Sequence, residues 1–214
     1  MKKGLTELIF ILDRSGSMYG LEKDTIGGYN SMLEKQKNIQ GECKITTVLF
    51  NHKTEVIHNR VDMNEVRKLT EKDYEVYGNT ALLDAIGESI ENMVSVERHT
   101  KEEYQAEKIL FVIITDGMEN SSREYSLSQI KTMIENQRKN YNWEFIFLGA
   151  NIDSIETARI LGIDEDNAVN YHADKKGTEL NYKVMADTIS DYRRSGKIEK
   201  SSLNEIRRDY KNRG

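Results

Sequence analysis

The stretch "ELIFILDRSGS", residues 7–17, decides the fold of this chain. Its first half is an apolar run that ends at Asp13, and two serines follow at alternate positions, Ser15 and Ser17. Unalternating Ile, Leu and Phe are typical of a strand that is covered on both faces, as in a parallel sheet. One carboxylate and two hydroxyls at the end of such a strand form either a polar turn or a set of oxygen ligands for a metal ion.

Further apolar segments predict that this strand belongs to a larger sheet. Apolar runs typical of strands covered on both faces recur in "KITTVLF" (44–50), "KILFVIITD" (108–116) and "WEFIFLGA" (143–150). The segment "KTEVIHNRV" (53–61) alternates instead and predicts a hairpin partner at the sheet edge, while "NAVNYHA" (167–173) predicts a weaker, later strand.

Apolar stripes at helical spacing lie between these strands. The stripes are Ile26, Tyr29, Met32 and Leu33; Ile86, Ile90, Met93 and Val94; Leu127, Ile130, Met133 and Ile134; and Tyr182, Met185, Ile189 and Tyr192. Capping-box patterns predict further helix starts near Asp153 and Ser202. The alternation of strands and helices predicts an α/β fold: a Rossmann-like, doubly wound, mostly parallel sheet with one antiparallel edge strand and helices on both faces.

Oxygen-bearing side chains gather where this topology places ligand sites. Such sheets bind ligands at the carboxyl ends of their strands. Asp13 and Asp116 each end a predicted strand, and Thr80 precedes a helix in the glycine loop "YGNTALLDAIG" (77–87). Each piece alone is ordinary turn or cap chemistry. Together they form a set of oxygen donors of the kind that Mg²⁺ prefers.

In these residues the sequence resembles the von Willebrand factor A domain family. The metal-ion-dependent adhesion site of that family has the pattern Asp-x-Ser-x-Ser with a distant Thr and a distant Asp. Here "DRSGS" (13–17), Thr80 in "GNTAL" and Asp116 in "TDG" match it. The resemblance spans at least residues 5–150, and the chain is similar to the small stand-alone bacterial or phage-borne members.

The resemblance implies a site and a function. Asp13, Ser15, Ser17 and Thr80 would surround a divalent cation, with Asp116 close by and often bridged through water. Mg²⁺ is the expected ion, with Mn²⁺ as a substitute and Ca²⁺ as the weaker fit. The cation would bind an acidic group, a Glu or Asp carboxylate, of a partner protein. The chain would then be a protein-binding module and not an enzyme.

Two alternatives belong to other functional classes. A Mg²⁺-dependent phosphoryl-transfer hydrolase of dehalogenase-like type also has an Asp after its first strand, but such enzymes use Asp-x-Asp and this chain has Ser15 at the second position. Neither a Walker loop nor G-x-G-x-x-G occurs in the sequence. The second alternative is binding of nucleic acid or an acidic surface through a basic tail.

Charge is distributed unevenly along the 214 residues. The formal net charge is −5, yet residues 193–214 carry eight Lys/Arg and three Asp/Glu. We therefore expect a domain over residues 4–195 and a basic helical tail over residues 196–214, with Arg207 and Arg208 in its last helix. A solvated helix end is the favoured interpretation. Folding of the tail onto the acidic body, to set an oligomer or block the site, stays open.

Cysteine content and hydropathy predict a cytoplasmic protein. Cys43 is the single cysteine, which fits a reducing compartment, and we expect it to be a buried small apolar residue. The uncharged apolar run near the start covers only residues 8–12, which is too short for a signal peptide. No apolar stretch of the sequence approaches the roughly 20 residues of a membrane-spanning helix.

The sequence assigns no role in the site to several other polar residues. Glu119 and Asn120 follow the second aspartate and are expected in a solvated loop, with the rim of the site as the alternative. His172 and Asp174 form a weak His-x-Asp pair after the last strand. Glu7, inside the first strand, is expected to be solvated.

Overall fold

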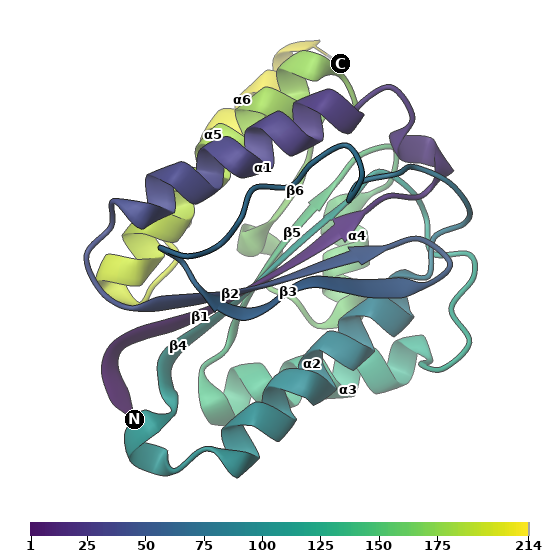
Figure 1. Ribbon diagram of the computed structural model, residues 1–214. Coiled ribbons are helices and arrows are strands. Elements are labelled where there is room, and N and C mark those ends of the chain that lie inside the picture. Colours follow the sequence, from purple (N-terminus) through teal and green to yellow (C-terminus); the bar gives the residue numbers. More distant parts are fainter. Residues whose placement is uncertain (214) are drawn as a thin grey trace.

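A six-stranded sheet forms the middle layer of the chain in the computed structural model, which describes residues 1–213 (Figure 1). Its strands are β1 (Lys2–Asp13), β2 (Cys43–Phe50), β3 (Thr54–Asp62), β4 (Ala106–Thr115), β5 (Glu144–Gly149) and β6 (Ala168–Asn170). Their order across the sheet is β3-β2-β1-β4-β5-β6. Every neighbouring pair is parallel except β2 and β3, so the predicted α/β sheet with one antiparallel edge strand is confirmed.

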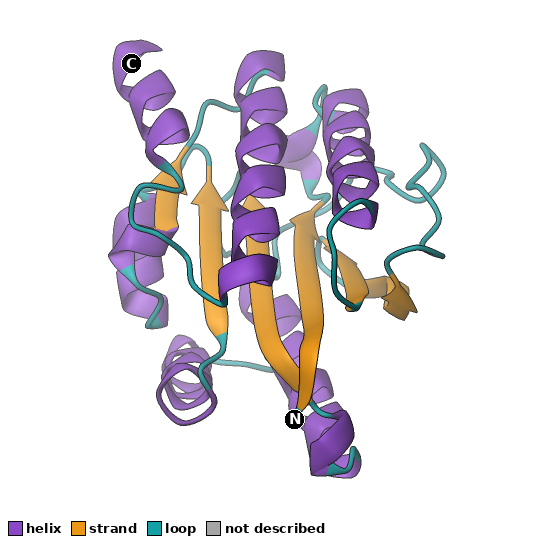
Figure 2. Ribbon diagram, turned by 90° about the vertical axis from the view of Figure 1, so that its left-hand side faces the viewer, coloured by secondary structure: helices purple, strands orange, loops and turns teal. Residues whose placement is uncertain are grey.

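Helices cover both faces of the sheet (Figures 1 and 2). They are α1 (Glu22–Lys37), α2 (Leu82–His99), α3 (Leu127–Tyr141), α4 (Ser154–Leu161), α5 (Lys175–Ser195) and α6 (Asn204–Arg213). Short 3₁₀ turns cover Gly16–Met18, Glu102–Tyr104 and Glu165–Asn167. Helices α1, α5 and α6 pack on one face, and α2, α3 and α4 on the other. None of the helices within residues 1–213 has the length and apolar content needed to cross a bilayer.

The central strand β1 explains the unbroken apolar run of the sequence. Leu8, Phe10 and Leu12 point into the core beneath α1 and α5, whereas Ile9 and Ile11 point into the core beneath α2 and α3. Successive side chains of a strand face opposite sides of the sheet, so a strand covered on both sides needs apolar residues at every position.

Glu7 was expected to be solvated, and that expectation is wrong. Its side chain lies inside β1 and only 1% of the residue is exposed. Arg60, on β3, compensates this buried charge: its Nη2 lies 2.8 Å and its Nε 3.1 Å from Glu7 Oε1. A buried carboxylate without such a partner would be strongly destabilising.

The predicted basic tail folds onto the body of the protein. Leu203 and Ile206 are buried in the core shared with α1 and α5. The Arg207 guanidinium donates to the carbonyl oxygens of Asp166, at 2.6 Å, and Ala168, at 3.3 Å. Helix α6 thereby covers β6 at the edge of the sheet.

We expect Ile206→Ala to destabilise the whole domain by about 2–5 kcal/mol, because the buried side chain leaves a cavity beside α5. Arg208→Ala is the matched control. Arg208 is exposed on the same helix, so its loss should change stability by no more than about 0.5 kcal/mol. Denaturant unfolding of both variants measures the difference, and equal stability of the two would show that α6 contributes nothing to the fold.

Candidate metal site

The site lies where the strand order reverses. Strand β1 pairs with β2 on one side and with β4 on the other, and both neighbours run parallel to it. Asp13 is the last residue of β1, and Asp116 directly follows the last residue of β4. Two carboxylates from distant parts of the chain therefore reach the same crevice at the carboxyl ends of the central strands.

The Asp13 carboxylate is fixed by hydrogen bonds from its own loop and from the end of the neighbouring strand β4. The Ser15 backbone N–H donates to Oδ1 at 2.7 Å, and the Thr115 hydroxyl donates to Oδ2 at 2.6 Å. The Tyr74 hydroxyl donates to the Asp13 carbonyl oxygen from the loop that follows β3. These bonds hold the carboxylate in one orientation without using all of its acceptor capacity.

The hydroxyl groups of the motif converge on the second aspartate. Ser15 Oγ lies 3.0 Å from Ser17 Oγ, which donates to Asp116 Oδ1 at 2.5 Å. Gly117 packs between Ser17 and Thr80, because a Cβ atom on this glycine would lie 3.0 Å from Ser17 Oγ and 3.3 Å from Thr80 Oγ1. The structure thus brings all five predicted site residues together.

Glu119 and Asn120, predicted in a solvated loop with the rim of the site as the alternative, contact the segment from Thr80 to Leu83. Asn120 Oδ1 accepts from the Thr80 backbone N–H at 3.0 Å, and the Asn120 N–H donates to the Thr80 carbonyl at 3.1 Å. Glu119 accepts from the backbone N–H groups of Leu83, at 3.0 Å, and Ser122, at 2.7 Å. A carboxylate at the first turn of α2 suits the helix dipole. No local sequence signal places Glu119 at α2, because it lies 36 residues from Leu83 along the chain.

Glycines allow the loop after β3 to approach the motif closely. The Gly16 N–H donates to the Gly78 carbonyl at 3.0 Å, and the Tyr77 N–H donates to the Arg14 carbonyl at 3.1 Å. Gly78 has a φ of +78°, which favours glycine. The buried Arg14 side chain pairs with Glu55 on β3 at 2.6 Å. The motif loop is therefore held from the side of β3 as well as from β4.

The two aspartates are costly to bury as anions. Burial raises the pKa of Asp13, and burial together with the nearby Asp13 charge raises the pKa of Asp116 to about 6. Asp116 Oδ2 is buried and has no hydrogen-bond partner among residues 1–213. Within the same residues, no group of three or more His, Cys, Asp or Glu is placed to hold a metal ion. Two carboxylates and three hydroxyls fit a hard divalent cation, which would neutralise the paired negative charge.

We expect the ion-free protein to gain stability relative to Asp116→Asn as the pH falls from about 7 to about 5. The folded state raises the pKa of Asp116 to about 6 from 3.8, so it binds the proton more tightly than the unfolded state. The contribution of this carboxyl to the free energy of unfolding is lost as the pH rises through about 6. Denaturant unfolding of both proteins across this pH range, with and without saturating Mg²⁺, measures that contribution. A trend that Mg²⁺ leaves unchanged would contradict ion binding at Asp116.

His172 and Asp174 lie outside this site and have structural contacts. The His172 ring stacks on Tyr210 with a centroid distance of 4.7 Å. Asp174 caps α5 by accepting from the Gly177 N–H at 2.8 Å, and it also pairs with Arg213. The His-x-Asp pair therefore fastens α6 to the β6–α5 connection. Cys43 is buried, as expected.

Comparison with known proteins identifies the fold. No protein-family model matches the chain, and no curated protein sequence matches it. A von Willebrand factor type A protein from Catenulispora acidiphila superposes with a TM-score of 0.54 at 14% identity, over 86% of this chain and 42% of that one. The ArnB paralog VWA2 from Sulfolobus acidocaldarius gives a TM-score of 0.56 at 16% identity, over 88% of this chain and 45% of that one.

A third neighbour is a manganese-loaded TRAP protein from Plasmodium vivax, with a TM-score of 0.54 at 16% identity, over 84% of this chain and 73% of that one. The chain spans less than half the length of the first two neighbours. At these identities the likeness concerns the fold. Together with the strand order and the single antiparallel edge strand, it shows that this chain has the fold of von Willebrand factor A domains.

Proposed function

We propose that this chain is a protein-binding module that holds a divalent cation and uses it to bind a carboxylate of a partner protein. The observation that carries the proposal is the buried Asp116 Oδ2, which has no hydrogen-bond partner among residues 1–213. The negative charge of Asp13 is close enough to raise the pKa of the same carboxyl. Such an atom is expected to have a ligand, and a cation satisfies it best.

The donor set leaves the cation reactive toward an anion. Asp13, Ser15, Ser17 and Thr80 would hold the ion, with Asp116 beside it. Three of these five groups are neutral hydroxyls, so the bound ion keeps much of its positive charge. Ser17 is exposed while the other four are buried, which marks the side from which a partner reaches the ion. Mg²⁺ is the proposed ion, and the manganese-loaded neighbour supports Mn²⁺ as a substitute.

Exposed apolar side chains around the site support a protein as the partner. Tyr19 is 83% exposed two residues after Ser17, and Met118 is 72% exposed two residues after Asp116. Tyr77, 48% exposed, lies in the third loop that contacts the motif. Aromatic and Met side chains around a charged anchor are typical of protein interfaces.

The alternatives have less support. A dehalogenase-like hydrolase needs an acid at the position of Ser15, whose hydroxyl instead lies beside Ser17. Nucleic-acid binding through the tail would compete with internal contacts, since Arg207 and Arg213 both bind groups of the domain itself. The cytoplasm remains the compartment that the sequence predicts, on the single free Cys43.

The proposal is tested by water-proton relaxation of the Mn²⁺-loaded protein. We expect a strong enhancement from water on the exposed side of the ion, and a saturable decrease when acetate displaces that water. Acetamide, which has the same shape without the charge, is the control. An enhancement that acetate does not reduce, or that both compounds reduce equally, would contradict a carboxylate-binding ion.

A further inference from the structure

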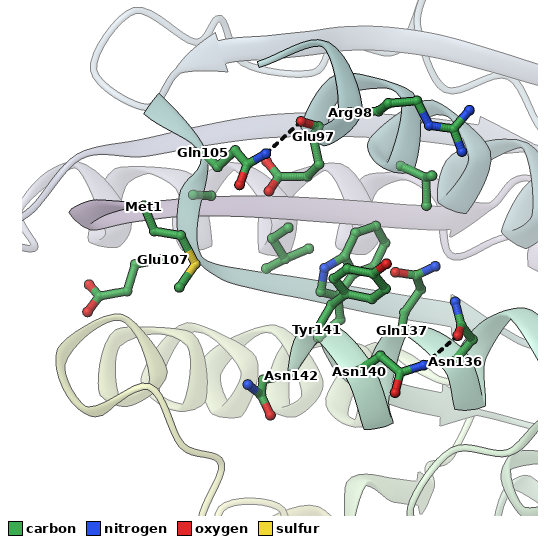
Figure 3. A pocket seen from close by; sticks show the side chains of 14 residues that line it. Met1, Glu97, Arg98, Gln105, Glu107, Asn136, Gln137, Asn140, Tyr141 and Asn142 are labelled. Atoms are coloured by element: carbon green, nitrogen blue, oxygen red, sulfur yellow. Dashed lines mark hydrogen bonds between the residues drawn. The ribbon is translucent and has the colours of Figure 1, made fainter. Parts of the chain in front are cut away.

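A cavity of about 510 Å³ lies at the opposite end of the sheet from the candidate metal site (Figure 3). It opens where β4 and β5 begin, between the last turns of α2 and α3. Its volume is within the range of about 300–1,000 Å³ that small-molecule sites occupy. Nothing in the proposed metal-dependent function uses it.

The floor of the cavity is apolar and rigid. It is formed by Trp143, Ile109 and Ala106, all of them buried. The Trp143 indole stacks on Phe111 with a centroid distance of 5.6 Å and an interplanar angle of 15°. One indole face is thus supported by the core, and the accessible part of the ring, with the residue 4% exposed, adds aromatic surface to the floor.

One carboxamide at the cavity, that of Gln137, lacks an internal partner. Gln137 on α3 is only 7% exposed, and its side chain takes part in none of the hydrogen bonds formed among residues 1–213. The neighbouring amides are used: Gln105 Nε2 donates to the Glu97 carbonyl at 2.8 Å, and Asn140 Nδ2 donates to Asn136 Oδ1 at 2.7 Å. The Gln137 carboxamide therefore has free hydrogen-bonding capacity at the cavity, where a polar atom of a ligand can reach it.

Two carboxylates, those of Glu97 and Glu107, line the cavity. Glu97 is half-buried and Glu107 is exposed, and neither has a Lys or Arg partner at ion-pair distance among residues 1–213. Glu107 Oε2 accepts from the Gly4 N–H at 2.7 Å, and the positive charge of the Met1 amino terminus acts on Glu97. The carboxyl-terminal ends of α2 and α3, which carry partial negative charge, border the same space. Burial raises the pKa of Glu97. Figure 3 shows the Arg98 guanidinium extending away from the Glu97 carboxylate.

We propose that this cavity binds a small organic ammonium ion. Its charged end lies against Glu97 and Glu107, an N–H group donates to the Gln137 carboxamide oxygen, and its apolar body contacts the Trp143 indole. The charge selects the class of ligand, and the aromatic floor selects amines that carry an apolar group over simple inorganic cations.

Trp143 supplies the readout, because it is the single tryptophan of the chain. Benzylamine is the probe, with benzyl alcohol and benzoate as neutral and anionic compounds of similar shape. We expect a saturable change of tryptophan fluorescence with benzylamine and no saturable change with the other two. Equal responses to all three compounds, or no response to benzylamine, would overturn the proposal.

Variants locate the binding within the cavity. Glu97→Gln and Gln137→Leu are each expected to weaken benzylamine binding by about tenfold, the usual loss for a hydrogen bond to a charged group. Glu65→Gln removes an exposed carboxylate that does not line the cavity and should leave binding unchanged. If Glu65→Gln weakened binding as much as Glu97→Gln, the effect would be one of net charge, and the assignment of the site would be wrong. Mn²⁺ binding should be unaffected in all three variants, which separates this proposal from the metal site.

Discussion

Asp13→Asn is expected to weaken Mg²⁺ and Mn²⁺ binding by about a hundredfold or more, since loss of even an outer partner of a metal ligand costs about 10–100-fold. The substitution keeps the shape of the side chain and removes its charge. The folded state should persist, because Asp13 is held by hydrogen bonds from Ser15 and Thr115 that an amide oxygen can still accept in part. Calorimetric titration gives the affinity, and circular dichroism gives the thermal midpoint.

Two companion variants sharpen this result. Thr115→Val removes the hydroxyl that donates to Asp13 Oδ2 at 2.6 Å. Because Thr115 would contact a metal ligand and not the metal itself, the substitution should lower the affinity for the ion by about 10–100-fold. Asp24→Asn removes a carboxylate on α1 outside the site and should change nothing. If Asp13→Asn bound the ion normally, or if it unfolded the protein, the assignment of Asp13 to the metal would be wrong.

Arg193→Met is expected to destabilise the fold by about 3–5 kcal/mol, because it removes a buried charge that several carbonyl groups depend on. Arg193 lies near the end of α5 and is only 5% exposed. Its Nη1 donates to the Gln36 carbonyl at 2.6 Å, and its Nη2 donates to the carbonyls of Ile39, at 3.1 Å, and Gly41, at 2.9 Å. These carbonyls belong to the end of α1 and the turn after it, where a cation suits the helix dipole.

Arg193→Lys is the matched control for that prediction. Lysine keeps the charge but cannot present the planar fork that reaches separate carbonyls, so we expect it to recover only part of the loss. For a domain of this size the thermal midpoint falls by about 2–4 °C per kcal/mol. A midpoint of Arg193→Met within about 2 °C of wild type would show that these carbonyls are satisfied without the guanidinium.

The sequence predicted the sheet and the candidate site because both depend on local patterns. The apolar run at 7–13 requires cover on both faces, and parallel strands bring their carboxyl ends to one edge, so Asp13 and Asp116 could be placed together without coordinates. The assignment of a cation to these side chains stays a prediction.

The features that sequence reasoning missed depend on partners far along the chain. Glu7 is buried only because Arg60 crosses from β3 to meet it, a separation of 53 residues. Arg193 was counted with the basic tail, although its partners lie 152 to 157 residues earlier. Neither pairing leaves a periodic trace in the sequence. The polarity of Glu7 therefore predicted the wrong environment for it, and the charge count over residues 193–214 gave no sign that Arg193 is buried.

Calorimetric titration of the chelator-stripped wild-type protein with Mg²⁺ and Mn²⁺ tests the central claim most directly. We predict one bound ion per chain for either metal, with Ca²⁺ weaker, and affinity that falls as the pH drops below about 6 because protons compete for the Asp116 carboxylate. Absence of binding at millimolar Mg²⁺ and Mn²⁺ would contradict the claim. The residues "DRSGS" would then be a polar turn at the end of a buried strand.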